Sequence, residues 1–149
     1  MLTKEIMYGV LCYYSTLYGI DPKVSATIVQ LESSGNPTAK GKAGEIGLMQ
    51  LLPSSFPDHM PEDLYDPITN VREGVRYLSI VKRSCRFKSN FKYVICYNRG
   101  PTGGNKVVSP KENEYYLKFM SLYKKGFKED GSEVFGNFIS DVNVRNCYR

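Results

Sequence analysis

The chain has 149 residues, 42% of them hydrophobic, which is enough to bury one core but not two. No apolar stretch approaches the ~20 residues that span a bilayer, so we expect a single domain over residues 1–149 without an integral membrane segment. The net charge of +5 attracts polyanions, but the basic residues are spread along the chain without interleaved stacking aromatics. We interpret them as a solvated surface and predict no nucleic-acid binding.

Two helices are predicted in the first 35 residues. From Thr3 to about Tyr18, apolar residues recur at helical spacing and share one face. Asp21-Pro22 then combines an N-cap with a proline at the first helical position. This pair is expected to open a second helix that ends near residues 33–35.

A long amphipathic helix is predicted after Asp66-Pro67, which repeats the combination of cap and proline. The helical spacing of apolar residues continues from there to about Lys82. A following helix must end by Gly100-Pro101, because proline breaks a helix interior. The apolar members of that helix are Phe91, Val94 and Ile95.

The last predicted helix covers residues 111–125 and buries part of an aromatic and apolar face. That face consists of Tyr116, Phe119, Met120 and Tyr123. Residues 126–149 have weaker periodicity, and we treat them as a C-terminal extension of unknown role that follows a core of about residues 3–125. The chain is therefore predicted to be mainly α-helical.

Four cysteines lie far apart in the sequence and lack the close CxxC spacing of a zinc or redox site. They are Cys12, Cys85, Cys96 and Cys147. Their even number permits two disulfides in an oxidising compartment, and free buried thiols are an equal alternative. The sequence alone leaves both open.

Glu32 is the candidate for acid chemistry, because it continues the apolar line of the second predicted helix. Val24, Ile28 and Glu32 follow one another at i, i+4 spacing, which places all three on one face. Burial and the negative end of the helix dipole both disfavour an anion there and should raise the pKa of the carboxyl. A carboxyl protonated near neutral pH is suited to general acid catalysis. The alternative is an exposed glutamate paired with a lysine.

Four ordered segments resemble the soluble lytic transglycosylases, the SLT family, which is related to goose-type lysozymes. They are ESSGNPTA at 32–39, GEIGLMQ at 44–50, LYDP at 64–67 with Asn70, Gly74, Tyr77 and Leu78, and YNRGP at 97–101. The resemblance covers residues 17–123. It implies a lysozyme-like fold with a substrate cleft and at most a small β-hairpin or irregular segment near residues 38–47.

The resemblance also implies an activity. The chain would cleave the β-1,4 bond between N-acetylmuramic acid and N-acetylglucosamine in peptidoglycan, with Glu32 as the single acid and base. The muramic 6-hydroxyl would attack intramolecularly and leave 1,6-anhydromuramic ends. No metal or organic cofactor would be required.

Substrate contacts follow from the same resemblance. They fall on Ser33, Gly47, Met49, Gln50, Tyr97 and Asn98. Gly47 would let the backbone approach the glycan, and Tyr97 would hydrogen-bond near Glu32 or the reacting sugar. The ordinary structural alternatives are core packing for Met49 and Tyr97 and backbone capping for Gln50. Glu112 and Tyr116 match a fainter element of the family.

Two positions depart from the family pattern. Gly41 stands where many members have a serine that touches the substrate, which removes one sugar contact. Glu45 replaces a commonly small residue and adds a carboxylate to the motif. It would serve as a water-activating base in a muramidase, or it is a solvated loop glutamate; we prefer the second reading and rank intramolecular transfer above hydrolysis.

The expected setting is the periplasm or the cell wall, with glycan strands as the partner of a monomeric enzyme. No secretory signal is visible at the N-terminus. This favours a bacteriophage lysin or virion enzyme, and a component of a secretion apparatus is the rival. A non-catalytic peptidoglycan-binding or assembly protein and a nucleic-acid-binding helical domain remain as other classes. The retained Glu32 argues against the former, and only the net charge supports the latter.

Overall fold

The computed structural model describes residues 4–125 and residue 147. Five α-helices dominate: α1 (Lys4–Leu17), α2 (Pro22–Ser33), α3 (Pro67–Ser84), α4 (Val94–Asn105) and α5 (Glu114–Lys125). Four short 3₁₀ turns connect them: η1 (Pro53–Ser55), η2 (Pro61–Tyr65), η3 (Ser89–Phe91) and η4 (Pro110–Glu112). The predicted mainly α fold class is confirmed. The unassigned segment 126–149 lies outside the described residues, apart from Cys147.

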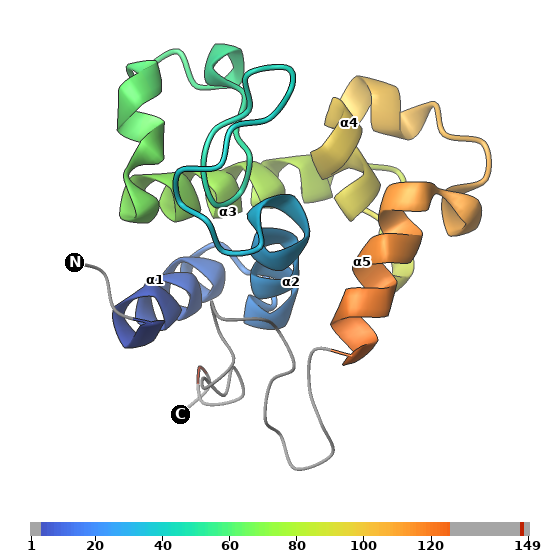
Figure 1. Ribbon diagram of the computed structural model, residues 1–149. Coiled ribbons are helices and arrows are strands. Elements are labelled where there is room, and N and C mark those ends of the chain that lie inside the picture. Colours follow the sequence, from blue (N-terminus) through green and yellow to red (C-terminus); the bar gives the residue numbers. More distant parts are fainter. Residues whose placement is uncertain (1–3, 126–146, 148–149) are drawn as a thin grey trace.

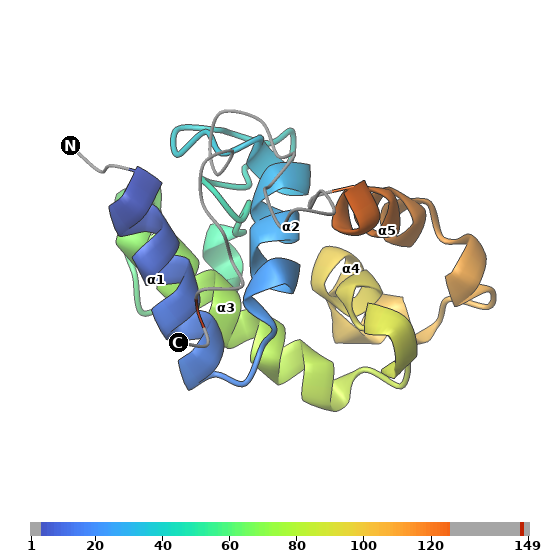
Figure 2. The same ribbon diagram turned by 90° about the horizontal axis from the view of Figure 1, so that it is seen from below.

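Helix α3 is the centre of the arrangement. It packs against α1 and α4, while α2 packs against α1 and α5 (Figures 1 and 2). Val75 and Leu78 of α3, Ile28 of α2 and Phe119 of α5 are fully buried in the shared core. Within the described ranges, no helix is both long and apolar enough to cross a membrane.

Helices α2 and α3 begin where the sequence predicted, and for the predicted reason. The Lys23 backbone N–H donates to the Asp21 carboxylate at 3.0 Å, and the Thr69 N–H donates to the Asp66 carboxylate at 3.0 Å. In each helix a proline follows the cap at a position where no backbone donor is needed. These caps fix the start of the helix that carries Glu32 and of the helix beneath the cleft.

The segment between α2 and α3 contains the expected irregular element. Two isolated antiparallel bridges pair Ile46 with Lys40 and with Leu51. Gly47 and Gln50 adopt positive φ values of 79° and 51°, which turn the chain back on itself. Figure 1 shows this segment, from cyan to green, gathered on one side of α3.

Asn70 of α3 fastens this loop to the core. Its Oδ1 accepts from the Met49 N–H at 2.9 Å, and its Nδ2 donates to the carbonyls of Ile46 at 2.9 Å and Leu64 at 2.8 Å. The amide lies directly against Gly47, where a Cβ would overlap Nδ2 of Asn70. One buried side chain therefore holds three points of the loop.

The region of α4 differs from the expectation in two details. Phe91 lies in η3 with a φ of 62°, before the helix and not inside it. The helix is interrupted at Gly100 (φ 77°, ψ 156°), as predicted, but helical structure resumes at Pro101 and continues to Asn105. Proline is well suited to this place because it begins a new helical turn.

All four cysteines are paired, as Cys12–Cys147 and Cys85–Cys96. The disulfide alternative is therefore the one the structure supports. The second bridge joins the residue that follows α3 to α4, directly before Tyr97. It thus helps to place the YNRG turn beside the end of α2.

Candidate active site

Glu32 lies in the last turn of α2, and its surroundings explain its position. Val24 and Ile28, which precede it on the same face, are fully buried. The helix ends at Ser33 and is capped by Ser34, which has a left-handed backbone at φ 52° and donates its N–H to the Gln30 carbonyl at 3.0 Å. The side chain of Glu32 is half-buried and accepts a hydrogen bond of 3.1 Å from the Tyr115 hydroxyl at Oε2.

Burial raises the pKa of Glu32 from 4.5 to about 7. The Tyr115 hydrogen bond opposes this shift, and the charge of Glu45 adds to it. The pKa values of Tyr115 and Tyr97 lie well above 10, because both are buried and face the charge of Glu32. Both phenols therefore stay protonated in the neutral pH range, where the Glu32 carboxyl exchanges its proton.

A cleft of about 510 Å³ opens beside Glu32. Its walls come from the end of α2, the loop before α3, α3 itself and the YNRG turn. The lining residues are Glu32, Glu45, Gln50, Leu51, Leu52, Ser55, Phe56, Tyr77, Tyr97, Asn98, Arg99 and Gly100. Three of the rings form a row, with 5.8 Å between the centroids of Phe56 and Tyr77 and 5.7 Å between those of Tyr77 and Tyr97.

The cleft brings together several of the residues that the sequence predicted for it: Glu32, Glu45, Gln50, Tyr97 and Asn98. Gln50 also caps backbone groups, since its Nε2 donates to the carbonyls of Ala39 at 3.2 Å and Gly47 at 3.0 Å. The Tyr97 hydroxyl donates to the Met49 carbonyl at 2.6 Å, so the loop holds its ring at the cleft wall.

Three of the residues that the sequence predicted to contact substrate are engaged with other parts of the protein. The Ser33 hydroxyl donates to the Leu48 carbonyl at 2.7 Å, which ties the end of α2 to the loop. Gly47 makes room for the Asn70 amide, so the close approach at this glycine is within the protein. Met49 is fully buried and packs against Gly74, where a Cβ would lie 3.0 Å from the Met49 Cβ. None of the three belongs to the cleft lining.

The tyrosine whose hydroxyl reaches Glu32 is Tyr115. The sequence predicted Tyr97 near Glu32, and its fainter family match on this helix fell on the neighbouring Tyr116. The Tyr116 hydroxyl points elsewhere and donates to the Asn90 carbonyl at 2.8 Å, and Glu112 is exposed in η4. The reason is helical phase, since adjacent residues on α5 point about 100° apart. The aromatic richness of residues 115–123 marks the helix but does not give its rotation about its axis.

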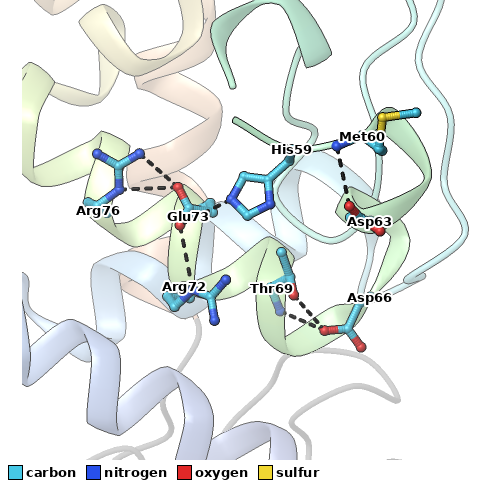
Figure 3. Close-up of polar contacts among 8 residues, drawn as sticks. All are labelled: His59, Met60, Asp63, Asp66, Thr69, Arg72, Glu73 and Arg76. Atoms are coloured by element: carbon cyan, nitrogen blue, oxygen red, sulfur yellow. Dashed lines mark hydrogen bonds and ion pairs between the residues drawn. The ribbon is translucent and has the colours of Figure 1, made fainter. Parts of the chain in front are cut away.

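A second polar cluster includes His59, the only histidine of the chain (Figure 3). It lines a smaller pocket that shares Ser55 and Phe56 with the cleft. Glu73 is buried there and faces His59 Nε2 at 3.6 Å, Arg72 Nε at 3.5 Å and Arg76 Nη2 at 2.7 Å. Burial alone would raise the pKa of Glu73, but the hydrogen bonds from Arg76 and Arg72 and the charge of Arg76 hold it below its usual value. The cluster fastens the segment before α3 to that helix. Within the described part of the chain, no group of three or more His, Cys, Asp or Glu side chains is arranged to hold a metal ion.

The raised pKa of Glu32 has a consequence for stability. Because the folded state binds the Glu32 proton more tightly than the unfolded chain, the stabilisation is complete below pH 4.5 and is lost as pH rises through about 7. Glu32→Gln removes this titration. The difference in unfolding free energy between the variant and the native chain should therefore grow in favour of the variant by on the order of 2 kcal/mol as the pH rises from 5 to 8. Urea denaturation at both pH values measures it.

The matched control for this experiment is Glu62→Gln, because Glu62 is exposed in η2. Its difference from the native chain should be the same at pH 5 and pH 8. A Glu32→Gln difference that also stays constant between the two pH values would contradict the raised pKa.

Residues 11–119 match the sequence profile of the family described as the transglycosylase SLT domain. The chain therefore belongs to the SLT family, which confirms the resemblance carried by its four motif segments. The matched range contains Glu32, every cleft-lining residue and Tyr115.

Relatives of the chain include bacterial and phage proteins. It is 32% identical to the membrane-bound lytic murein transglycosylase E of Buchnera aphidicola, over 74% of this chain and 57% of that protein. It is 37% identical to the transglycosylase of Enterobacteria phage PRD1, over 48% of this chain and 29% of that protein. It is 34% identical to the endo-type membrane-bound lytic murein transglycosylase A of Klebsiella pneumoniae, over 44% of this chain and 37% of that protein. The chain thus spans less than two thirds of the length of these relatives.

Proposed function

We propose that the chain is a lytic transglycosylase that cleaves the β-1,4 bond between N-acetylmuramic acid and N-acetylglucosamine in peptidoglycan. The observation that carries this proposal is Glu32, a half-buried carboxyl with a pKa of about 7 at the wall of a cleft lined by aromatic rings. Family membership supports it, since the relatives are named lytic murein transglycosylases.

The proposed reaction uses one carboxyl twice. Protonated Glu32 donates to the bridging glycosidic oxygen while the bond from that oxygen to the muramic C1 breaks, and an oxocarbenium-like centre develops. The muramic 6-hydroxyl oxygen then bonds to C1, and its proton returns to Glu32. The products are an N-acetylglucosamine 4-hydroxyl and a 1,6-anhydromuramic end, and no water is consumed.

Tyr115 and the cleft wall support this cycle. The Tyr115 hydroxyl donates to Oε2, which leaves Oε1 for the transferable proton and stabilises the carboxylate between the two steps. The row of Phe56, Tyr77 and Tyr97 offers apolar faces to the sugar rings. Gln50 and Asn98 supply polar groups at the same wall, whereas Ser33, Gly47 and Met49 act by holding the loop in place.

The proposed place of action is the bacterial cell wall. The two disulfides of the chain fit an oxidising location outside the cytoplasm. The phage relative is compatible with a virion enzyme or lysin, and the bacterial relatives are compatible with a wall-remodelling enzyme. Glycan strands are the proposed partner in either case.

The decisive experiment analyses the muropeptides that the protein releases from purified sacculi. If the 6-hydroxyl attacks, the new ends are anhydromuramic acid, which borohydride does not reduce and which is lighter by one water than a hydrolytic end. We expect predominantly anhydro ends by mass spectrometry after borohydride treatment. Absence of any release would contradict the proposed activity.

A muramidase is the second candidate, and Glu45 is the observation that favours it. This carboxylate lines the same cleft as Glu32 and raises the pKa of Glu32 through its charge. An inverting hydrolase needs such a second carboxylate to activate water. Predominantly reducible ends in the sacculus experiment would select hydrolysis and leave Glu32 as the acid.

A further inference from the structure

The Glu45 carboxylate is held at a defined position in the cleft by hydrogen bonds within its own loop. Its Oε1 accepts from the Ala43 backbone N–H at 3.0 Å, and the Gly41 N–H donates to the Glu45 carbonyl at 2.8 Å. A Cβ at residue 41 would overlap Oε2 of Glu45 and would lie 2.7 Å from its Cδ. Glycine at position 41 is therefore what leaves space for the carboxylate.

Gln50 turns a second oxygen toward the same point. Its Nε2 is held by the carbonyls of Ala39 and Gly47, so the orientation of the amide is fixed. Its Oε1 would lie 2.8 Å from the same Cβ at residue 41. Two oxygens that accept hydrogen bonds thus converge above one glycine.

The two oxygens that face Gly41 are Glu45 Oε2 and Gln50 Oε1, and within residues 4–125 neither of them accepts a hydrogen bond. The other carboxylate oxygen, Glu45 Oε1, accepts from the Ala43 N–H. Both side chains line the cleft that holds Glu32. Glycan strands are rich in suitable donors, namely sugar hydroxyls and acetamido N–H groups, and a bond to a carboxylate is stronger than one between neutral groups.

From this arrangement we infer that Glu45 and Gln50 together bind a hydroxyl or acetamido N–H donor of the glycan, and that Gly41 is the residue that permits it. The inference rests on the proposed function for the identity of the substrate. Glu45 is then a substrate-binding residue, and the removed serine contact at position 41 is replaced by a carboxylate from position 45. The charge of Glu45 also helps to keep Glu32 protonated.

The test compares four proteins on soluble, uncross-linked glycan strands, with kcat and KM measured separately. Glu45→Ala should raise KM about tenfold or more, the scale for losing a hydrogen bond to a charged group, while kcat falls less. Gly41→Ala should raise KM in the same way, because the new methyl displaces the carboxylate. The double variant should lie within about threefold of Gly41→Ala, because the methyl at position 41 already displaces the carboxylate and also meets Gln50 Oε1.

Glu45→Gln provides the conservative variant, since it keeps an acceptor oxygen; its KM should fall between those of the native chain and Glu45→Ala. Glu62→Ala, in exposed η2, should behave as the native chain. Thermal unfolding of each variant checks the fold. A KM for Glu45→Ala within twofold of native, or fully multiplicative effects of Gly41→Ala and Glu45→Ala, would overturn the inference.

The inference and the proposed function fail in different ways. Release of anhydromuropeptides by the native chain tests the function, and the pattern of KM values tests the acceptor pair. If the native chain releases nothing, calorimetry of the same strands with the native chain and with Glu45→Ala still decides the inference. Tenfold weaker binding by Glu45→Ala supports it, and equal binding overturns it.

Discussion

Glu32→Gln is expected to lose at least a hundredfold in activity on purified sacculi while it keeps the fold. Glutamine preserves the shape of the side chain and can still accept the Tyr115 hydrogen bond at its oxygen. It has no transferable proton, and loss of a general acid costs roughly 10²–10⁴ in rate. Because the buried anion is removed as well, the variant should be no less stable than the native chain at pH 8.

Turbidity loss of a sacculus suspension measures this effect. Glu62→Gln makes the same chemical change at an exposed position of η2 and should clear the suspension at the native rate. Substantial clearing by Glu32→Gln would show that another group supplies the proton, and Glu32 would then be a positioning residue at most.

Asn70→Ala is expected to produce the largest loss of stability of any single substitution discussed for this chain. It leaves the Met49 N–H and the Leu64 carbonyl unpaired in the buried interior, whereas the Ile46 carbonyl keeps its bond from the Leu51 N–H. Each unpaired buried group costs about 1–3 kcal/mol, so the free energy of unfolding should fall by about 3–5 kcal/mol. The midpoint of thermal unfolding should fall by roughly 10–20 °C for a chain of this size.

Asn36→Ala is the control for this prediction. The Asn36 side chain also accepts backbone and side-chain bonds, from Thr38, but it is exposed to solvent. Its loss should cost about 1 kcal/mol or less, because water replaces the lost partner. Equal effects of the two substitutions would mean that Asn70 does not hold the loop.

The helix starts and the raised pKa of Glu32 were predictable because their signals are local. Asp21 and Asp66 cap their helices through bonds to residues two and three positions further on, and the line of Val24, Ile28 and Glu32 depends only on helical period. Tertiary context added little to these features. The SLT motifs then supplied the loop and the YNRG turn that face Glu32.

The missed features depend on contacts between distant segments. Tyr115 reaches Glu32 because of how α5 rotates against α2, and no spacing within α5 determines that rotation. Gly47 matches the family motif, but the sequence does not show that the Asn70 side chain fills the space above it. The pairing of the cysteines was open for the same reason, since four cysteines allow three connectivities.

The Cys12–Cys147 bridge changes what a protease can do to this molecule. It joins positions separated by 135 residues, so nearly the whole chain is one covalent ring. A single cut at any peptide bond within the ring creates two new ends but releases no fragment. Glu32, the cleft loop and Tyr115 all lie inside the ring, so they stay on one molecule after such a nick. Separating them requires a second cut or reduction of the bridge.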